Sequence, residues 1–213
     1  MSSNPVIRKI HLIRHGETNW NKDKRAQGQL ESVLTPDGMT QAQELKTRLQ
    51  GIPITEVYCS SSVRTRQTAD ILFGDRLIGD LVIPIVYCDQ LREIHMGPWQ
   101  GLLYSELREK DPDQFHAFWH QPEKFALVGA ETYQDVQRRA IKRLDEILQQ
   151  SSAEDIAIVS HGVLIKTILC DAEQRPLAQL WDGPAMHNCA RSEINIHADG
   201  SRRICVYSDR PYK

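Results

Sequence analysis

The amino-acid sequence predicts an α/β fold, a three-layer α/β/α sandwich around a mainly parallel sheet with a small helical lid insertion. Segments typical of strands alternate with segments typical of helices, which is the pattern of a parallel sheet covered on both faces. Residues 156–159 (IAIV) form a short, continuously apolar run, as expected of a central parallel strand. The 213 residues suffice for one domain over residues 1–213, with the lid insertion at about residues 99–131.

The first part of the chain predicts a strand, a helix and a second strand. The first strand is expected over residues 7–13 and the second over residues 54–59. Between them, Thr35 can cap a helix that has Pro36 in its first position and ends at Gly51. The apolar stripe of this helix would consist of Met39, Ala42, Leu45 and Leu49.

The middle of the chain predicts a helix over residues 63–73, which Gly74 ends, and a short strand over residues 81–87. The following stretch, residues 99–131, is rich in Trp, Phe, His and Pro, and its helical periodicity is interrupted. This composition is why we place the helical lid here.

The last part of the chain begins with Thr132, which caps a strongly amphipathic helix, with Asp135 three residues on completing the capping pattern. The apolar positions of this helix are Tyr133, Val136, Ala140, Ile141, Leu144, Ile147 and Leu148. After the apolar strand described above, a helix is expected over residues 163–169. Two strands, over residues 193–197 and 203–207, complete the predicted fold.

Composition and charge exclude several classes of function. The formal net charge is −2 and the pI about 6.4, so there is no overall basic field for nucleic acid or an anionic membrane surface. No apolar run approaches the roughly 20 residues that span a bilayer, and the N-terminal segment lacks the apolar core of a signal peptide. The cysteines are scattered and never spaced as a metal-binding pair, namely Cys59, Cys88, Cys170, Cys189 and Cys205. We expect a cytoplasmic protein with reduced thiols.

Two predicted strands end in the same way, in a histidine followed by glycine. The first strand is followed by Arg14, His15 and Gly16, and the strand at residues 156–159 is followed by Ser160, His161 and Gly162. In an open α/β sheet, ligands bind at the carboxyl ends of the strands, and each glycine lets the backbone approach a ligand closely. Either histidine alone could be structural, but the repeated pattern favours a shared site.

Charged side chains near the same strand ends predict an anion site with an acid beside it. Arg14 must find an anion or stay in solvent, and Arg64 follows the second strand near a helix N-terminus. Two guanidinium forks and a helix N-terminus suit a tetrahedral dianion such as phosphate, whereas Arg66 fits a solvated helix surface. Glu93 follows the predicted strand at residues 81–87. It is either a general acid, which nearby phosphate oxygens would keep protonated, or a partner in a surface ion pair with an arginine such as Arg92.

Four segments in this order, LIRHGETNWN, SSSVRTRQTA, LREIHMGPWQG and IVSHG, resemble the histidine phosphatase superfamily, also called the phosphoglycerate mutase-like family. The resemblance covers nearly the whole chain. It implies a phosphohistidine enzyme in which His15 is the nucleophile and Glu93 is the proton donor. The phosphate pocket would consist of Arg14, Arg64 and a protonated His161. Further phosphate and substrate contacts would come from Asn21, Gln27, Gly28 and Gly162.

This chemistry leads to expectations about the two histidines and about metal. One ring nitrogen of His15 should face phosphorus while the other donates to a backbone carbonyl, which we expect in the turn at Gly16. Arg14, Arg64 and His161 would supply the positive charge that Mg²⁺ supplies in many phosphoryl-transfer sites. No carboxylate cluster indicates a metal, so we expect neither a metal nor a cofactor.

The activity expected is metal-independent hydrolysis of a small phosphorylated metabolite. The stretch from Glu93 to His161 is shorter than in a cofactor-dependent phosphoglycerate mutase, and the chain is similar to short bacterial broad-specificity phosphatases. A phosphoserine phosphatase, a mutase and a non-catalytic phosphate-binding module remain alternatives. The aromatic residues of the lid either pack it onto the body or line a pocket for an apolar leaving group; they are Trp99, Phe115, Phe118, Trp119 and Phe125. A homodimer through an exposed edge strand is also left open.

Overall fold

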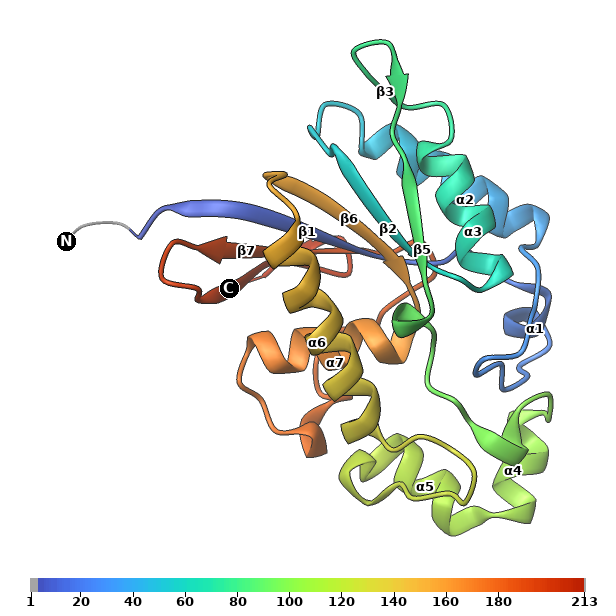
Figure 1. Ribbon diagram of the computed structural model, residues 1–213. Helices are drawn as coiled ribbons and strands as arrows, with labels where there is room; N and C mark the ends of the chain where they lie inside the picture. Colours follow the sequence, from blue (N-terminus) through green and yellow to red (C-terminus); the bar gives the residue numbers. More distant parts are fainter. Residues whose placement is uncertain (1–3, 213) are drawn as a thin grey trace.

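Seven strands form one mixed sheet within residues 4–212, the part of the chain that the computed structural model describes. Their order across the sheet is β5-β2-β6-β1-β7-β8-β9 (Figure 1). The strands are β1 (Val6–Arg14), β2 (Glu56–Ser60), β5 (Ile85–Cys88), β6 (Asp155–Ser160), β7 (Arg191–His197), β8 (Arg202–Tyr207) and β9 (Arg210–Pro211). Strands β5, β2, β6 and β1 run parallel, and β7, β8 and β9 extend the sheet in antiparallel fashion.

Helices cover both faces of the sheet, as the predicted sandwich requires. The α-helices are α1 (Asn19–Lys22), α2 (Pro36–Arg48), α3 (Val63–Phe73), α4 (Tyr104–Lys110), α5 (Pro112–His120), α6 (Tyr133–Gln150) and α7 (Gly162–Ala172). Helices α2 and α3 pack on one face, whereas α6 and α7 pack on the other (Figure 1). The segment predicted as the lid forms α4 and α5, which lie beyond the N-terminal end of α6.

The predicted caps explain where the two long surface helices begin. The Thr35 hydroxyl accepts a hydrogen bond from the backbone N–H of Gly38 at 3.0 Å, with Pro36 in the first position of α2. Thr132 and Asp135 form the reciprocal capping box of α6. Met39, expected in the apolar stripe of α2, is 46% exposed, so that assignment is wrong.

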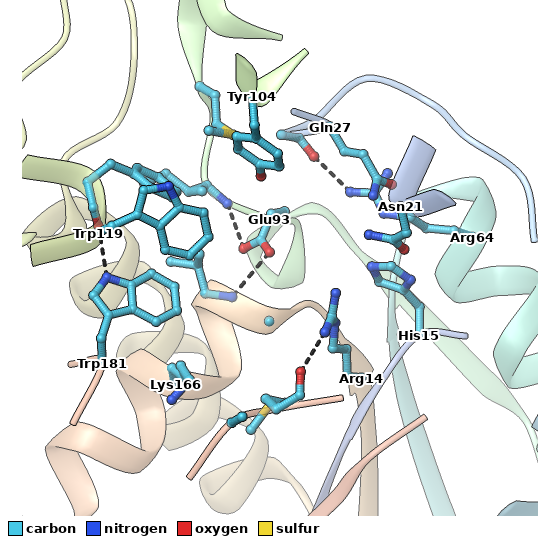
Figure 2. A pocket seen from close by; sticks show the side chains of 18 of the residues that line it. Arg14, His15, Asn21, Gln27, Arg64, Glu93, Tyr104, Trp119, Lys166 and Trp181 are labelled. Atoms are coloured by element: carbon cyan, nitrogen blue, oxygen red, sulfur yellow. Dashed lines mark hydrogen bonds between the residues drawn. The ribbon is translucent and has the colours of Figure 1, made fainter. Parts of the chain in front are cut away.

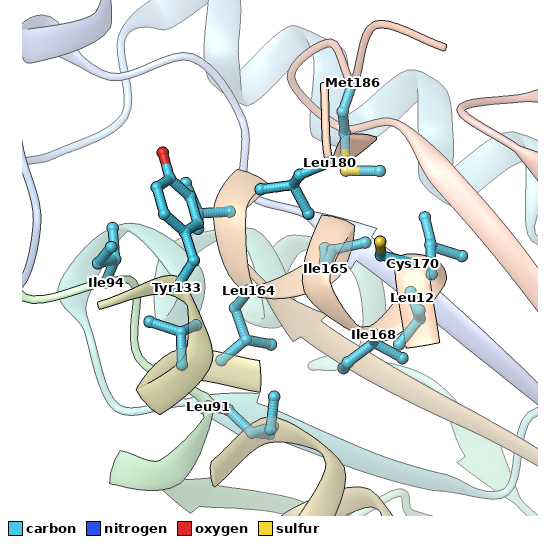
Figure 3. Close-up of a cluster of buried hydrophobic side chains, with 14 of the residues drawn as sticks. Leu12, Leu91, Ile94, Tyr133, Leu164, Ile165, Ile168, Cys170, Leu180 and Met186 are labelled. Atoms are coloured by element: carbon cyan, nitrogen blue, oxygen red, sulfur yellow. The ribbon is translucent and has the colours of Figure 1, made fainter. Parts of the chain in front are cut away.

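Alternate residues of β1 face the two cores, because successive side chains of a strand point to opposite sides. Ile10 and Leu12 pack against α6 and α7, whereas Ile13 packs between the sheet and α2 and α3. Figure 3 shows Leu12 beside Ile165 and Ile168 of α7 in the larger core. This two-sided burial holds β1 rigidly where it delivers the residues that follow it.

Strands β1 and β6 are parallel neighbours in register, with Arg14 opposite Ser160. The backbone N–H of His15 also donates to the Ser160 carbonyl at 3.0 Å. The two His-Gly sequences therefore leave the sheet side by side at the same edge. This juxtaposition is the structural basis of the candidate site.

The strand expected over residues 81–87 is wrong as a single element. Residues 81–82 form β4 (Leu81–Val82), which pairs only with β3 (Leu77–Ile78) in a small exposed hairpin, and β5 then joins the main sheet. Pro84 separates the two pieces, and because proline has no N–H it interrupts the ladder. The short elements α1 and β9 were not predicted from the sequence.

Candidate active site

A cavity of about 440 Å³ opens at the carboxyl ends of the parallel strands. Its wall contains eight of the nine predicted site residues, namely Arg14, His15, Asn21, Gln27, Gly28, Arg64, Glu93 and Gly162. The ninth, His161, lies behind the wall with its ring centre 5.3 Å from that of His15. Figure 2 shows six of these cavity-lining residues pointing toward one another from different elements, namely Arg14, His15, Asn21, Gln27, Arg64 and Glu93.

The His15 ring is held in one orientation by a backbone carbonyl. Its Nδ1 lies 2.7 Å from the carbonyl oxygen of Gly16, the turn in which we expected that partner. Nδ1 therefore carries the proton, and Nε2 keeps its lone pair on the cavity side. Burial, together with the positive charges of Arg64 and Arg14, holds the His15 pKa well below its ordinary value. At neutral pH the imidazole is uncharged, which is the nucleophilic form.

The turn after His15 packs against the first turn of α2 without space for a side chain. A Cβ added at Gly16 would lie 2.5 Å from the Gly38 carbonyl oxygen, and one at Gly38 would lie 2.1 Å from the Glu17 carbonyl oxygen. The Gly16 N–H also donates to the Thr68 hydroxyl of α3 at 3.1 Å. The sheet, α2 and α3 together fix the carbonyl that orients His15.

Arg14 and Arg64 bring two positive charges to the cavity, but they present them differently from the prediction. Arg64 is completely buried, and both its Nη atoms donate to backbone carbonyls, those of Leu30 at 2.9 Å and Gly28 at 2.7 Å. The expected free fork is thus used on the backbone, and only Nε lacks a partner. Nε of Arg14 is also buried without a partner in the described chain, while its Nη1 donates to the Met186 carbonyl at 2.5 Å.

The first backbone N–H of α3 is not free to bind an anion. This N–H, that of Val63, donates to the Glu31 carboxylate at 2.7 Å. Burial lowers the pKa of Arg64 to about 10, which leaves this guanidinium charged at neutral pH. Arg64 therefore brings positive charge to this side of the cavity, and the contribution expected of the helix N-terminus stays a prediction for the N–H groups that follow Val63.

His161 is completely buried and differs from the prediction in its charge. Its Nε2 lies 2.8 Å from the Ser60 hydroxyl, and its Nδ1 is buried without a partner within residues 4–212. Burial and the nearby charge of Arg64 hold the His161 pKa well below its ordinary value. His161 is therefore neutral in the free site, whereas the protonated ring expected in the phosphate pocket stays a prediction for the site with an anion bound.

Glu93 lies at the N-terminus of α7 rather than in a surface ion pair. Its carboxylate accepts three backbone N–H groups, those of Ile94 at 3.0 Å, Val163 at 3.1 Å and Leu164 at 3.2 Å. Figure 2 shows two of these bonds as dashed lines at Glu93. Arg92, the alternative partner, pairs instead with Glu31 at 2.9 Å. The Glu93 carboxylate is thus directed to the cavity wall opposite the His15 ring.

Asn21 and Gln27 are oriented so that their amide nitrogens remain for a ligand. The Asn21 Oδ1 accepts from the backbone N–H of Thr18 and from Asn188, and the Gln27 Oε1 accepts from the Ser32 hydroxyl. The Thr18 hydroxyl lies 3.1 Å from both oxygens and can donate its one proton to either. Because both oxygens are engaged, each side chain offers its NH₂ to the cavity that it lines. Both predicted positions therefore lie where an anion would contact them.

Gly28 contributes to the site through its backbone carbonyl, which binds Arg64. Its φ of +52° is in the left-handed region, and a Cβ there would lie 2.3 Å from the Gln100 side chain. This conformation directs its carbonyl to Arg64. At Gly162, an added Cβ would meet Arg14 only at 3.5 Å, which is ordinary contact.

The other end of the cavity is mostly apolar and aromatic, and the sequence predicted only part of it. Among the lid aromatics, Phe118 and Trp119 line the cavity, whereas Trp99 and Phe125 are buried in the core. Trp119 lies 5.0 Å from Trp181, centre to centre. Sequence reasoning missed these further lining residues: Ile94, Met96, Tyr104, Val163, Lys166, Trp181, Gly183, Ala185 and Met186.

Lys166 is the most informative of the missed residues. It is 3% exposed, and its ammonium group donates to the Pro184 carbonyl at 3.1 Å and lies 5.5 Å from the ring centre of Trp181. Burial lowers the pKa of Lys166 to about 8. A single lysine inside the apolar run VLIKTIL was the signal in the sequence that could have identified it.

The described part of the chain contains neither a metal-binding cluster nor a membrane-spanning helix. No three His, Cys, Asp or Glu side chains there lie close enough to hold a metal ion. None of its helices is long and apolar enough to cross a membrane.

Comparisons with known proteins agree with this geometry. The family model of the histidine phosphatase superfamily, branch 1, matches residues 10–209. A metal-independent phosphoserine phosphatase of Arabidopsis thaliana is 32% identical over 165 residues, covering 76% of this chain and 67% of the relative. The probable phosphoglycerate mutase GpmB of Erwinia tasmaniensis is 33% identical over 194 residues, covering 87% and 84%.

Among solved structures, Bacillus stearothermophilus YhfR matches with a TM-score of 0.89 and 37% sequence identity, covering 95% of this chain and 97% of that one. The sheet edge, the paired histidines and the family match over residues 10–209 agree with one another. The chain is a phosphatase that belongs to branch 1 of the histidine phosphatase superfamily.

Proposed function

We propose that this chain is a metal-independent phosphomonoesterase that hydrolyses small phosphorylated metabolites through a phosphohistidine intermediate on His15, with Glu93 as the proton donor. The observation that carries the proposal is the orientation of His15. The Gly16 carbonyl binds Nδ1, so a neutral Nε2 is available on the cavity side, between Arg14 and Arg64. A neutral imidazole there can displace an alcohol from a bound phosphate ester.

In the first step, the Nε2 lone pair of His15 forms a bond to phosphorus while the bond from phosphorus to the ester oxygen breaks. Glu93 donates a proton to that oxygen, so the alcohol leaves without charge. The two guanidinium groups stabilise the negative charge on the transferring phosphoryl oxygens, with the amide NH₂ of Asn21 beside them. The Nε atoms of both arginines are buried and have no partner within residues 4–212.

In the second step, water attacks the phosphohistidine. The Glu93 carboxylate takes a proton from the water as the new bond from oxygen to phosphorus forms, and the bond from phosphorus to Nε2 breaks. Inorganic phosphate leaves, His15 returns to its neutral form, and Glu93 is protonated again. No metal is needed, because Arg14 and Arg64 carry the positive charge, and they would repel a cation placed between them.

The shape of the cavity supports a substrate whose alcohol part has an apolar or flat body. Phe118, Trp119 and Trp181 enclose the end away from His15, with Lys166 in the same wall. The name of the Arabidopsis relative, a metal-independent phosphoserine phosphatase, supports small phosphorylated metabolites as the class. We further expect a cytoplasmic location, because the five scattered cysteines are all free thiols.

A second candidate function is mutase activity, favoured by the similarity to a probable phosphoglycerate mutase. Both functions use a phosphohistidine, but they differ in what accepts the phosphoryl group. A hydrolase transfers it to water, whereas a mutase returns it to a phosphoglycerate. Release of inorganic phosphate and interconversion of 2- and 3-phosphoglycerate therefore distinguish the two.

The test is phosphate release from a panel of esters in excess EDTA. The panel contains p-nitrophenyl phosphate, 1-naphthyl phosphate, phosphoserine, 3-phosphoglycerate and glycerol 3-phosphate. We expect metal-free hydrolysis that His15→Ala abolishes, while the matched variant of an exposed histidine on α5, His116→Ala, keeps it. A protein-bound phosphate that acid releases and base preserves should form in the wild type during turnover. Activity that EDTA removes, or that His15→Ala retains, contradicts the proposal.

A further inference from the structure

The backbone that carries Glu93 has no regular secondary structure to hold it. A short 3-10 turn, Asp89–Leu91, precedes it, and residues 93–96 belong to no helix or strand. The three N–H groups that bind the Glu93 carboxylate fix the end of the side chain but leave the main chain to be held by other contacts. A catalytic acid must be held to within fractions of an ångström, so these contacts matter for its chemistry.

Arg139, on α6, supplies three of these contacts. Its Nη1 donates to the carbonyls of Gln90 at 2.9 Å and Arg92 at 2.6 Å, and its Nη2 donates to the carbonyl of Glu93 itself at 2.9 Å. One guanidinium thus binds three carbonyls within four residues, and its planar shape sets their relative positions. The Glu93 carbonyl also accepts from Gln29 at 3.0 Å.

Glu131 fixes Arg139 and extends the contact to the other side of Glu93. Its two carboxylate oxygens accept from Nε and Nη2 of Arg139 at 2.7 and 2.9 Å, a bidentate pair. The same carboxylate accepts the backbone N–H of His95 at 2.8 Å, and the Glu131 N–H donates back to the His95 carbonyl. The ion pair therefore holds the chain both before and after Glu93.

We propose that Arg139 and Glu131 form a clamp that positions Glu93 for proton transfer to the leaving group. The inference rests on the proposed function, because the clamp can act in catalysis only if Glu93 is the proton donor. Neither residue lines the cavity, so both act through Glu93 as positioning residues. Because α6 begins directly after the lid segment, the clamp also ties the acid to the helix that packs over α7.

The clamp predicts a dependence on the leaving group that a general loss of structure would not produce. An alkoxide leaves poorly and needs the proton, whereas p-nitrophenolate leaves without it. Arg139→Lys keeps the charge but cannot bind three carbonyls and a carboxylate together. The two esters are compared by kcat/KM, which reports formation of the phosphohistidine and not its hydrolysis, the step in which Glu93 acts as base on either ester. We expect kcat/KM for glycerol 3-phosphate to fall about tenfold or more and kcat/KM for p-nitrophenyl phosphate to change less than about threefold.

The matched control is Arg138→Lys, on the same helix turn. The Arg138 side chain is 75% exposed and pairs only with Asp135, so neither ester should respond. Glu131→Gln, which nearly preserves the shape of the side chain, tests the clamp independently if Arg139→Lys folds poorly. When Glu93→Gln is already present, adding Arg139→Lys should not slow the hydrolysis of either ester further. Glutamine has no acidic proton to donate, so its position no longer matters for proton transfer.

The outcomes separate the clamp from the proposed function. If Glu93→Gln is selective for glycerol 3-phosphate but Arg139→Lys and Glu131→Gln slow both esters equally, the clamp is only structural and the inference is overturned. If Glu93→Gln itself lowers kcat/KM equally for both esters, Glu93 is not the proton donor and the proposed function is wrong on this point. The proposed role of the clamp is then wrong as well. Selectivity in all three variants, with no additional loss in the double variant, supports the clamp.

Discussion

The contact between Gly38 and the turn after His15 gives the sharpest prediction about how the fold supports the site. Gly38 lies in the first turn of α2, and its φ is not in the left-handed region, so alanine is compatible with its backbone. Alanine is the better helix former by up to about 1 kcal/mol. Helix propensity alone therefore predicts that Gly38→Ala stabilises the protein.

Packing predicts instead that Gly38→Ala destabilises the protein, and this effect is the larger of the two. The new Cβ would lie 2.1 Å from the Glu17 carbonyl oxygen and 2.9 Å from the Glu17 nitrogen, both backbone atoms. The turn must move by about 1 Å. Because both neighbours are backbone atoms, the cost lies in the upper part of the overpacking range, about 2–3 kcal/mol, which exceeds the gain in propensity. Because the Gly16 carbonyl orients His15, the same movement should lower kcat, on the order of 100-fold for a 1 Å misplacement.

The assay combines urea unfolding with turnover of p-nitrophenyl phosphate. We expect Gly38→Ala to lose about 1–2 kcal/mol of unfolding free energy after the gain in propensity is subtracted. Met39→Ala is the matched control on the next residue, which is 46% exposed, and it should change the unfolding free energy by less than about 0.5 kcal/mol. A Gly38→Ala protein as stable and as active as the wild type would refute the reasoning.

Three further predictions follow from buried groups of the cavity. Lys166 loses its proton near pH 8 in the folded protein but near 10.5 when unfolded, so the unfolded state binds more protons between these values. The unfolding free energy of the wild type should therefore rise by about 3 kcal/mol from pH 8 to pH 10.5, compared with that of Lys166→Met. Urea unfolding measures both proteins across this range, and the same pH dependence in both would contradict the prediction. Arg64→Lys cannot donate to both the Leu30 and Gly28 carbonyls and to a ligand, so the Ki for inorganic phosphate in an inhibition assay should rise about tenfold or more. Trp181→Ala removes one aromatic side chain from the cavity wall. The value of kcat/KM should therefore fall about tenfold more for 1-naphthyl phosphate than for glycerol 3-phosphate, and an equal fall for both esters would contradict this prediction.

The sequence predicted the sheet edge well because its signals there are local. An apolar strand followed by His-Gly is visible wherever it occurs, and two such strands must end near one another if they are parallel neighbours. The register of β1 with β6, which puts Arg14 opposite Ser160, satisfies that condition. The caps at Thr35 and Thr132 were likewise predictable, since each depends on residues three positions apart.

The orientation of the charged groups could not be predicted, because distant backbone sets it. Arg64 binds carbonyls more than thirty residues earlier in the chain, and Glu93 binds N–H groups about seventy residues later. Neither partner has a sequence signature. The cavity wall at Trp181 comes from a loop without periodicity, so no hydrophobic pattern identified it. The break at Pro84, in contrast, was visible and was overlooked.

The charge of His161 links these observations to a last prediction. The free site holds two guanidinium groups and two neutral imidazoles, and burial beside Arg64 keeps the His161 pKa well below its ordinary value. A bound dianion reverses that balance, because its negative charge beside the buried ring raises the His161 pKa and favours a proton there. Binding should therefore take up a proton.

Sulfate is a suitable probe, since it stays a dianion from pH 5 to 8 and its own titration does not interfere. We expect its affinity to increase as the pH falls through this range, because the complex binds more protons than the free enzyme. Calorimetry in buffers of different ionisation enthalpy measures the uptake directly, and His161→Gln should abolish it. If the wild type binds sulfate without proton uptake, His161 stays neutral in the complex, and the positive charge of the phosphate pocket comes from Arg14 and Arg64 alone.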